Sequence, residues 1–218
     1  MTPDFKKPKF ITFEGGEGSG KSTQSKMLYE YLISNKIKAI HTREVGGTPE
    51  AEKIRDILVY SDLYATTELM LVMAARYEHI NKVIIPALAG GSWVICDRYV
   101  DSTVCYQSGK SGLTIQEIYQ LHDKLMTARD TSTIETGIMP DLTFFMDMPP
   151  ENGLKRVKSR GEANKFEEMD MDFHKEVYDR FKLIADLYKG RMVTIECLGL
   201  LPEQIHKKII DKLNYGEQ

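Results

Sequence analysis

Cysteine is scarce in this chain of 218 residues, and long hydrophobic runs are missing. The three cysteines, Cys96, Cys105 and Cys197, form no C-x-x-C pair, and an odd count without a disulfide framework suits a reducing compartment. No apolar run is long enough to span a bilayer, and the N-terminal segment MTPDFKKPKF lacks the apolar region of a signal peptide. We therefore expect a cytoplasmic protein.

A large net charge is also lacking. The formal value of -3 gives no general attraction to nucleic acid or to anionic membranes, so we expect neither as a partner. The five histidines show no metal-ligand spacing, which disfavours a metal site built on imidazole. Because no internal repeat, low-complexity tract or linker composition is visible, the length predicts a single domain over residues 1–218.

Short apolar runs alternate with stretches of helical periodicity, and this alternation predicts an α/β fold. Five runs are typical of buried parallel strands: Phe10–Phe13, Ala39–Thr42, Trp93–Cys96, Leu142–Met146 and Val193–Ile195. Helices are predicted over Ser22–Ser34, Pro49–Tyr60, Thr67–Ala89, Thr114–Thr127, Pro149–Arg156 and Pro202–Leu213. A parallel sheet wound on both sides gathers its ligands beyond the carboxyl ends of its strands.

The most specific motif lies between the first strand and the first helix, in FITFEGGEGSGKSTQ. Gly15, Gly20, Lys21 and Ser22 satisfy G-x-x-x-x-G-K-[ST], the phosphate-binding loop of nucleoside triphosphate enzymes. Glycines let backbone N–H groups turn toward phosphate oxygens, the lysine can reach the β- and γ-phosphates, and the serine can ligate Mg²⁺. A plain glycine-rich turn is disfavoured by the strand before it and the helix after it. The residues predicted to bind ATP are Gly15, Gly16, Glu17, Gly18, Ser19, Gly20, Lys21, Ser22 and Thr23.

Further charged residues could support phosphoryl transfer, which needs positive charge, Mg²⁺ and an acceptor held in line. Asp97 and Arg98 end the third strand. The carboxylate there could hold Mg²⁺ through water, and the arginine could clamp an acceptor phosphate through two hydrogen bonds. Arg76 lies among apolar residues of a long predicted helix, where a snorkelling arginine is an equally good interpretation.

A charged, weakly periodic segment after the fourth strand could form a mobile flap over residues 156–172. Arg156 and Arg160 are four residues apart and share a face if the helix continues, although a solvated basic face is the plainer interpretation. Asp147 also ends an apolar strand and competes with Asp97 for the metal. We predict that Asp147 instead caps the helix that follows it.

These motifs, in this order, resemble those of the thymidylate kinase family. The matching segments run from Phe10 to about Asp172 and include FEGGEGSGKST, TREVGGT, ELMLVMAAR, VICDRYVDSTVCYQ and PDLTFFMDMPPENGLKRVKSRG. The resemblance implies a nucleoside monophosphate kinase fold, with a five-stranded parallel sheet flanked by helices and a mobile lid, and a homodimer packed through helices. It also implies that the γ-phosphoryl of MgATP is transferred to dTMP, which gives dTDP and ADP.

The same resemblance implies an acceptor pocket. Glu17 matches the acidic position that contacts the deoxyribose 3′-hydroxyl, and Arg76 matches the arginine that reaches the base carbonyl. Arg55 and Arg98 match the arginines that hold the dTMP phosphate, and Tyr106 matches a position that would help to reject ribonucleotides. The predicted pocket comprises Glu17, Glu44, Arg55, Val72, Arg76, Arg98, Ser102, Thr103, Tyr106 and Gln107.

The phosphate loop carries no arginine, whereas the flap carries two, so the chain is similar to the bacterial-type branch of the family. The resemblance predicts that Arg160 stabilises charge on the transferred phosphoryl group when the flap closes and excludes water. The predicted catalytic residues are Lys21, Asp97, Arg98, Arg156 and Arg160, and the predicted metal site is Ser22 with Asp97.

Three positions depart from the family pattern. Val45 replaces the usual proline, so its preceding peptide is either cis or follows a trans path. Val72 replaces a phenylalanine that stacks on thymine, a loss of about 1 kcal/mol that Met73 or Tyr99 could offset. Lys165 replaces a flap arginine and keeps the charge without the planar fork. These substitutions bear on affinity and base preference more than on reaction class.

Two alternatives stay open on sequence grounds. Another nucleoside monophosphate kinase or a deoxynucleoside kinase would share the phosphate loop, and Val72 leaves room for a relaxed choice of base. A GTPase-like switch would require the guanine-reading motif N-K-x-D. The three N-K dipeptides, at residues 35–36, 81–82 and 164–165, do not continue into that motif.

Overall fold

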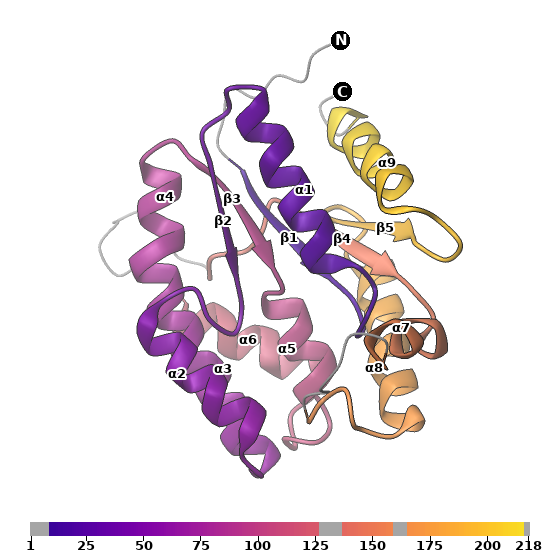
Figure 1. The fold of residues 1–218 in the computed structure, drawn as a ribbon. Coiled ribbons are helices and arrows are strands. Elements are labelled where there is room, and N and C mark those ends of the chain that lie inside the picture. The colour runs from indigo at the N-terminus through magenta and orange to yellow at the C-terminus, as the bar shows by residue number, and fades with distance from the viewer. Residues whose placement is uncertain (1–8, 127–136, 159–164, 216–218) are drawn as a thin grey trace.

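The computed structural model describes residues 9–126, 137–158 and 165–215. These residues form a five-stranded parallel sheet with the strand order β2–β3–β1–β4–β5 (Figure 1). All five apolar runs are confirmed as strands, each one to two residues longer than predicted. The strands are β1 (Phe10–Glu14), β2 (Ala39–Arg43), β3 (Trp93–Asp97), β4 (Leu142–Asp147) and β5 (Met192–Glu196).

The central strand β1 is buried along its whole length, between β3 on one side and β4 on the other. Its register places Phe13 opposite Asp97 and Glu14 opposite Phe145. Because the strands are parallel, their carboxyl ends meet at one edge of the sheet, and the phosphate loop leaves β1 at that edge. The acidic residues Glu14 and Asp97 are therefore close to the loop.

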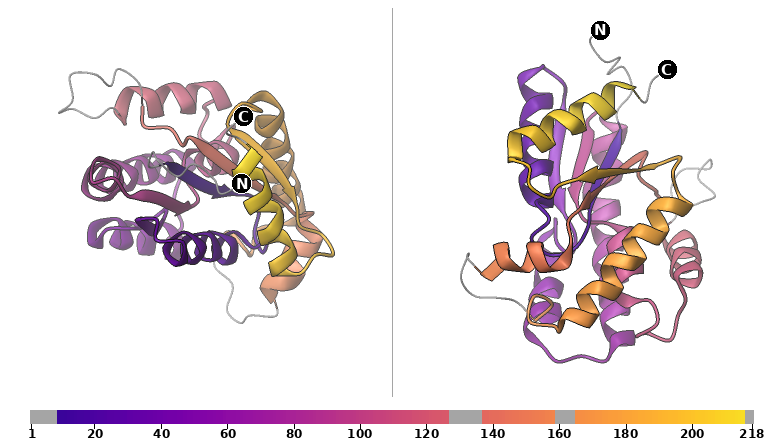
Figure 2. Two further views of the ribbon diagram at one scale, coloured as in Figure 1. Left: turned by 90° about the horizontal axis from the view of Figure 1, so that it is seen from above. Right: turned by 90° about the vertical axis from the view of Figure 1, so that its right-hand side faces the viewer.

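Helices cover both faces of the sheet, and each face has its own apolar core. On one face α1 and α9 pack over Ile11, Phe13 and Phe144. On the other face α3, α5, α6 and α8 enclose Phe10 and Phe145, and Figure 2 shows α1 and α9 on the opposite side of the sheet from α6 and α8. The helices are α1 (Lys21–Ser34), α2 (Pro49–Tyr60), α3 (Ala65–His79), α4 (Ile85–Ala89), α5 (Val100–Gln107), α6 (Ile115–Leu125), α7 (Pro150–Lys158), α8 (Met171–Leu187) and α9 (Pro202–Tyr215).

The long helix predicted over Thr67–Ala89 is three consecutive segments, because a π-helical turn (Ile80–Ile84) separates α3 from α4. Pro86 follows this turn and has no N–H to donate, and its ring would clash with a carbonyl one turn earlier in a regular helix. The wider π-helical turn before the proline avoids that clash.

The prediction that Asp147 caps the next helix is wrong. Helix α7 begins at Pro150, three residues further on, and Asp147 Oδ1 instead accepts a hydrogen bond from the Tyr178 hydroxyl at 2.7 Å. Asp170 does act as a cap, since its side chain accepts from the Phe173 N–H at the start of α8. Among the described residues, no helix is both long and apolar enough to cross a membrane.

Candidate functional site

The phosphate loop joins β1 to α1 through three glycines in left-handed backbone conformations. Gly15, Gly18 and Gly20 have φ values of 139°, 67° and 97°. A Cβ at Gly15 would lie 2.8 Å from the Met146 carbonyl oxygen, so a larger residue would displace the loop from β4. Glycine at these positions lets the backbone wrap around a phosphate group at the start of α1.

Lys21 is buried beneath this loop. Its Nζ donates to the Gly16 carbonyl oxygen at 2.6 Å and to Ser19 Oγ at 3.3 Å. Burial and the nearby Arg98 lower the pKa of Lys21 to about 8, although neighbouring carboxylates oppose the shift. A triphosphate in the loop would add negative charge and favour the protonated ammonium.

The residues predicted for a metal lie together. The Ser22 hydroxyl donates a hydrogen bond to Asp97 Oδ2. The second oxygen, Asp97 Oδ1, is buried and has no hydrogen-bond partner within the described part of the chain. A buried carboxylate oxygen with no partner is a costly arrangement unless another ligand or water satisfies it.

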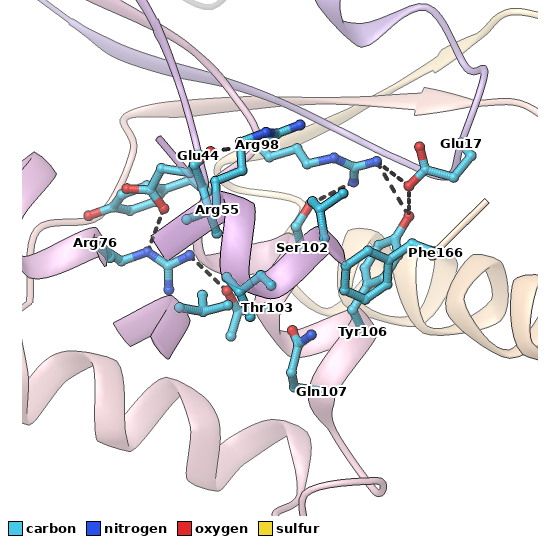
Figure 3. A pocket seen from close by; sticks show the side chains of 15 residues that line it. Glu17, Glu44, Arg55, Arg76, Arg98, Ser102, Thr103, Tyr106, Gln107 and Phe166 are labelled. Atoms are coloured by element: carbon cyan, nitrogen blue, oxygen red, sulfur yellow. Dashed lines mark hydrogen bonds and ion pairs between the residues drawn. The ribbon is translucent and has the colours of Figure 1, made fainter. Parts of the chain in front are cut away.

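All ten residues predicted for the acceptor line a single cavity, which we call the acceptor cavity (Figure 3). They come from the phosphate loop, the residue after β2, helices α2, α3 and α5, and the residue after β3. Five further residues complete the lining: Val45, Leu58, Val59, Tyr99 and Phe166. The peptide between Glu44 and Val45 is cis, one of the two paths expected at that position.

A second cavity lies over the phosphate loop and joins the first. We call it the donor cavity, and it includes Lys21, Ser22 and Asp97. The two cavities share four lining residues, Glu17, Glu44, Arg55 and Arg98. Arg55 and Arg98 therefore lie where a ligand in one cavity would meet a ligand in the other.

Arg98 is the most tightly held of these arginines. Its Nη1 donates to the Gly15 carbonyl oxygen and to Ser102 Oγ, both at 3.0 Å, and its Nη2 donates to Glu17 Oε1 at 2.7 Å. The Tyr106 hydroxyl donates to the same Glu17 oxygen at 2.7 Å. Burial alone would raise the pKa of Glu17, but Arg98 and Lys21 outweigh it and lower that pKa to about 2.

Arg76 anchors the opposite end of the acceptor cavity. It is 1% exposed, so the snorkelling interpretation is wrong. Its Nε donates to Glu44 Oε2 and its Nη2 donates to Thr103 Oγ1, both at 2.7 Å. His79 Nδ1 lies 2.9 Å from Glu44 Oε1 and His79 Nε2 lies 2.6 Å from Thr42 Oγ1. Although burial opposes ionisation, Arg76 and His79 lower the pKa of Glu44 overall.

The geometry thus provides a buried guanidinium at the inner end of one cavity, two shared arginines, and a lysine under a phosphate loop. The model of the thymidylate kinase family matches residues 13–209 of the chain. The chain belongs to the thymidylate kinase family. A thymidylate kinase of Rickettsia bellii (strain RML369-C) is 50% identical over 209 residues, which cover 96% of this chain and 97% of the relative.

Two further family members agree with this assignment. A thymidylate kinase of Rickettsia rickettsii (strain Sheila Smith) is 49% identical over 206 residues, covering 94% of this chain and 97% of the relative. The crystal structure of thymidylate kinase from Ehrlichia chaffeensis superimposes with a TM-score of 0.73 at 33% identity and covers 95% of this chain and 99% of that one. The family and its fold are therefore those that the motifs predict, and the GTPase alternative is wrong.

Two of the predicted catalytic residues belong to the flap segment. Arg160 lies outside the described residues. Arg156 lies in the last turn of α7 and is absent from the described lining of both cavities. The predicted flap begins within α7 and extends into the first residues of α8.

Sequence reasoning missed three contributors to the site. His79 contacts Glu44. It lies three residues after Arg76 on the same helix, and this spacing could have indicated that the two side chains share a face. Phe166 lines the acceptor cavity, with its ring 6.0 Å from that of Tyr106 (Figure 3), and Glu167 lines the donor cavity. No strand or periodic helix marks these last two residues, so their position depends on tertiary contacts.

The residue before Phe166 shows how this segment is anchored. Lys165 Nζ donates to Glu68 Oε1 at 2.5 Å and to the Ser61 carbonyl oxygen at 3.0 Å. These bonds tie the segment to the start of α3 and the end of α2. Phe166 is thereby held against the acceptor cavity, into which Val72 also projects from α3.

Proposed function

We propose that the chain transfers the γ-phosphoryl group of ATP to dTMP, which yields dTDP and ADP as a step of dTTP biosynthesis. The observation that carries this proposal is the joining of the acceptor and donor cavities at Arg55 and Arg98. Two anionic ligands that meet end to end require positive charge at their junction, and these arginines supply it.

The acceptor would lie with its phosphate near Arg98 and its base near Arg76. Within the described residues, Arg76 Nη1 contacts no carboxylate, so this N–H group is available to a base carbonyl. The neighbouring Nη2 is bonded to Thr103. Glu17 and Tyr106 lie nearer Arg98 and suit the sugar of a deoxynucleotide. Tyr106 would lie beside the sugar carbon that carries the 2′-hydroxyl of a ribonucleotide and would help to reject ribonucleotides.

The donor would lie in the phosphate loop, with Lys21 on its β- and γ-phosphates. The Ser22 hydroxyl and Asp97 would hold Mg²⁺, and the unpartnered buried Oδ1 of Asp97 supports this assignment. The ion, when bound, neutralises charge on the phosphates. Arg160 is proposed to stabilise the transferred group, with Arg156, four positions earlier in the sequence, as a second basic residue.

The proposed assembly is a homodimer that operates in the cytoplasm. Exposed apolar side chains gather on α2, α3 and the turn between them, where Ile57, Tyr60, Tyr64 and Met70 are 45–89% exposed. Exposed aromatic and aliphatic residues on adjacent helices are suited to a partner surface. Light scattering in solution tests this, and a mass equal to one chain of 24.9 kDa would contradict it.

A coupled assay with dTMP, dUMP, dCMP and AMP as acceptors tests the proposed reaction. We expect the highest kcat/KM with dTMP and the lowest with AMP, because Arg76 and Thr103 offer hydrogen bonds to a pyrimidine edge. Turnover of AMP equal to or better than that of dTMP would contradict the proposal.

A further inference from the structure

Arg98 has an unusual backbone conformation for a residue other than glycine. Its φ of 70° lies in the left-handed region, which is unfavourable for a side chain with a Cβ unless surrounding bonds hold it there. The peptides on both sides of Arg98 are bonded to the end of β1. The Arg98 N–H donates to the Phe13 carbonyl oxygen at 3.0 Å, and the Tyr99 N–H donates to Glu14 Oε1 at 2.7 Å.

The side chain of Arg98 leads to the same carboxyl group. Arg98 Nη1 donates to Ser102 Oγ at 3.0 Å, and Ser102 Oγ donates to Glu14 Oε2 at 2.5 Å. One oxygen of Glu14 therefore fixes the backbone after Arg98, and the other fixes the hydroxyl that contacts the guanidinium. Glu14 is 0% exposed on the central strand and lies outside the lining of both cavities.

The surroundings of Glu14 favour a role in holding Arg98 over simple filling of the core. Asp101 is the other buried acid nearby, and its oxygens are bonded to Arg191 at 2.6 and 2.8 Å and to the Tyr119 hydroxyl at 2.5 Å. Asp101 thus has its own partners on α6 and before β5. Both oxygens of Glu14, in contrast, are bonded to residues that flank or contact Arg98.

We propose that Glu14 is a positioning residue that holds Arg98 in place to bind the acceptor phosphate. The inference rests on the proposed function, since it assumes that Arg98 contacts that phosphate. Glu14 does not contact the ligand itself. A shift of the guanidinium by a fraction of an ångström would weaken its bonds to a phosphate, while the contacts proposed for the base, at Arg76 and Thr103, would be unaffected.

The test compares the Kd of dTMP with that of thymidine, which lacks the phosphate, by calorimetry. The Kd of thymidine divided by the Kd of dTMP measures how much the phosphate contributes to binding. We expect Glu14→Ala to reduce this ratio by about tenfold or more, the scale found for residues that support metal ligands, with a much smaller change in thymidine affinity. Glu14→Gln retains a bond to each partner and is expected to preserve most of the ratio.

Thr12→Val is the matched control, because Thr12 is equally buried on β1 and its side chain bonds to Thr143 rather than to Arg98. It should leave the ratio unchanged. If Glu14→Ala does not fold, Ser102→Ala breaks the same chain of bonds from α5 and should reduce the ratio similarly. An unchanged ratio in the folded variant overturns the inference, as does an equal loss of affinity for both ligands.

Arg98→Ala separates this inference from the proposed function. If its ratio equals that of the unaltered protein, Arg98 does not bind the acceptor phosphate, and the proposed role of Arg98 fails together with the inference. If Arg98→Ala lowers the ratio and Glu14→Ala does not, only the role of Glu14 fails.

Discussion

Replacing Glu44 by glutamine tests the buried ion pair that forms the inner wall of the acceptor cavity. Glu44 accepts from Arg76 at 2.7 Å and lies 2.9 Å from His79, and the side chains of all three residues are at most 3% exposed. Glutamine has nearly the same volume, but it removes the negative charge and replaces one acceptor oxygen by an NH2 donor. Glu44→Gln therefore leaves the Arg76 guanidinium buried without a counter-charge.

The expected cost follows from this burial. Removing one partner of a buried ion pair destabilises a protein by about 3–5 kcal/mol, because the remaining charge stays desolvated. In a domain of this size each kcal/mol lowers Tm by about 2–4 °C, so we expect a decrease of roughly 6–20 °C. Binding of dTMP should weaken as well, since Arg76 loses the carboxylate that orients it.

Thermal unfolding followed by circular dichroism measures the first effect, and calorimetric titration with dTMP measures the second. Glu50→Gln is the matched control, because Glu50 pairs with Lys82 at 3.1 Å but both side chains are about half exposed. We expect little change in its Tm, as is usual for surface ion pairs. The reasoning fails if Glu44→Gln unfolds at the same temperature as this control.

Four further outcomes are expected. Lys21→Ala should abolish phosphoryl transfer in a coupled assay while calorimetry still detects dTMP binding; intact turnover with lost dTMP binding would contradict its role. Because the pKa of Lys21 in the free protein is about 8 and the protonated form binds phosphate, kcat/KM for ATP should be level below pH 8 and fall about tenfold per unit above it, whereas a flat profile to pH 9.5 would refute this. Phe166→Ala should raise KM for dTMP about two- to tenfold with little change in kcat, as for loss of one aromatic contact, and Phe166→Leu should lie between; equal KM values would show that Phe166 does not contact the acceptor. Arg160→Ala should lower kcat about 100-fold or more with little change in acceptor KM, and an unchanged kcat would move the role to Arg156 or Lys158.

Local sequence signals were sufficient for the sheet and the phosphate loop. A buried parallel strand is apolar on both faces, so runs such as Trp93–Cys96 are recognisable without tertiary information. The loop is equally local, since its glycines and Lys21 act within eight residues. Parallel topology then implies that residues after β1, β2 and β3 meet at one edge of the sheet. The assignment of Glu17 and Glu44 to the acceptor pocket, in contrast, came from the family resemblance.

Elements that are fixed by distant contacts were not predictable. All eight residues of α5 are buried, so this helix shows no alternation between polar and apolar faces. Nothing in the local sequence distinguishes Glu14 from an ordinary residue at the end of a strand. Its role depends on Tyr99 and Ser102, which lie more than 80 positions away in the sequence. The place of Phe166 depends on the bonds of Lys165 to α2 and α3, which no spacing indicates.

A crystal structure with bound dTMP tests the central claim most directly, that one cavity holds the acceptor with its phosphate toward the phosphate loop. The account predicts the phosphate within hydrogen-bonding distance of Arg98, and a base carbonyl within the same distance of Arg76. A complex in which the phosphate lies away from Arg98, or the base lies outside the cavity between α3 and α5, would contradict it.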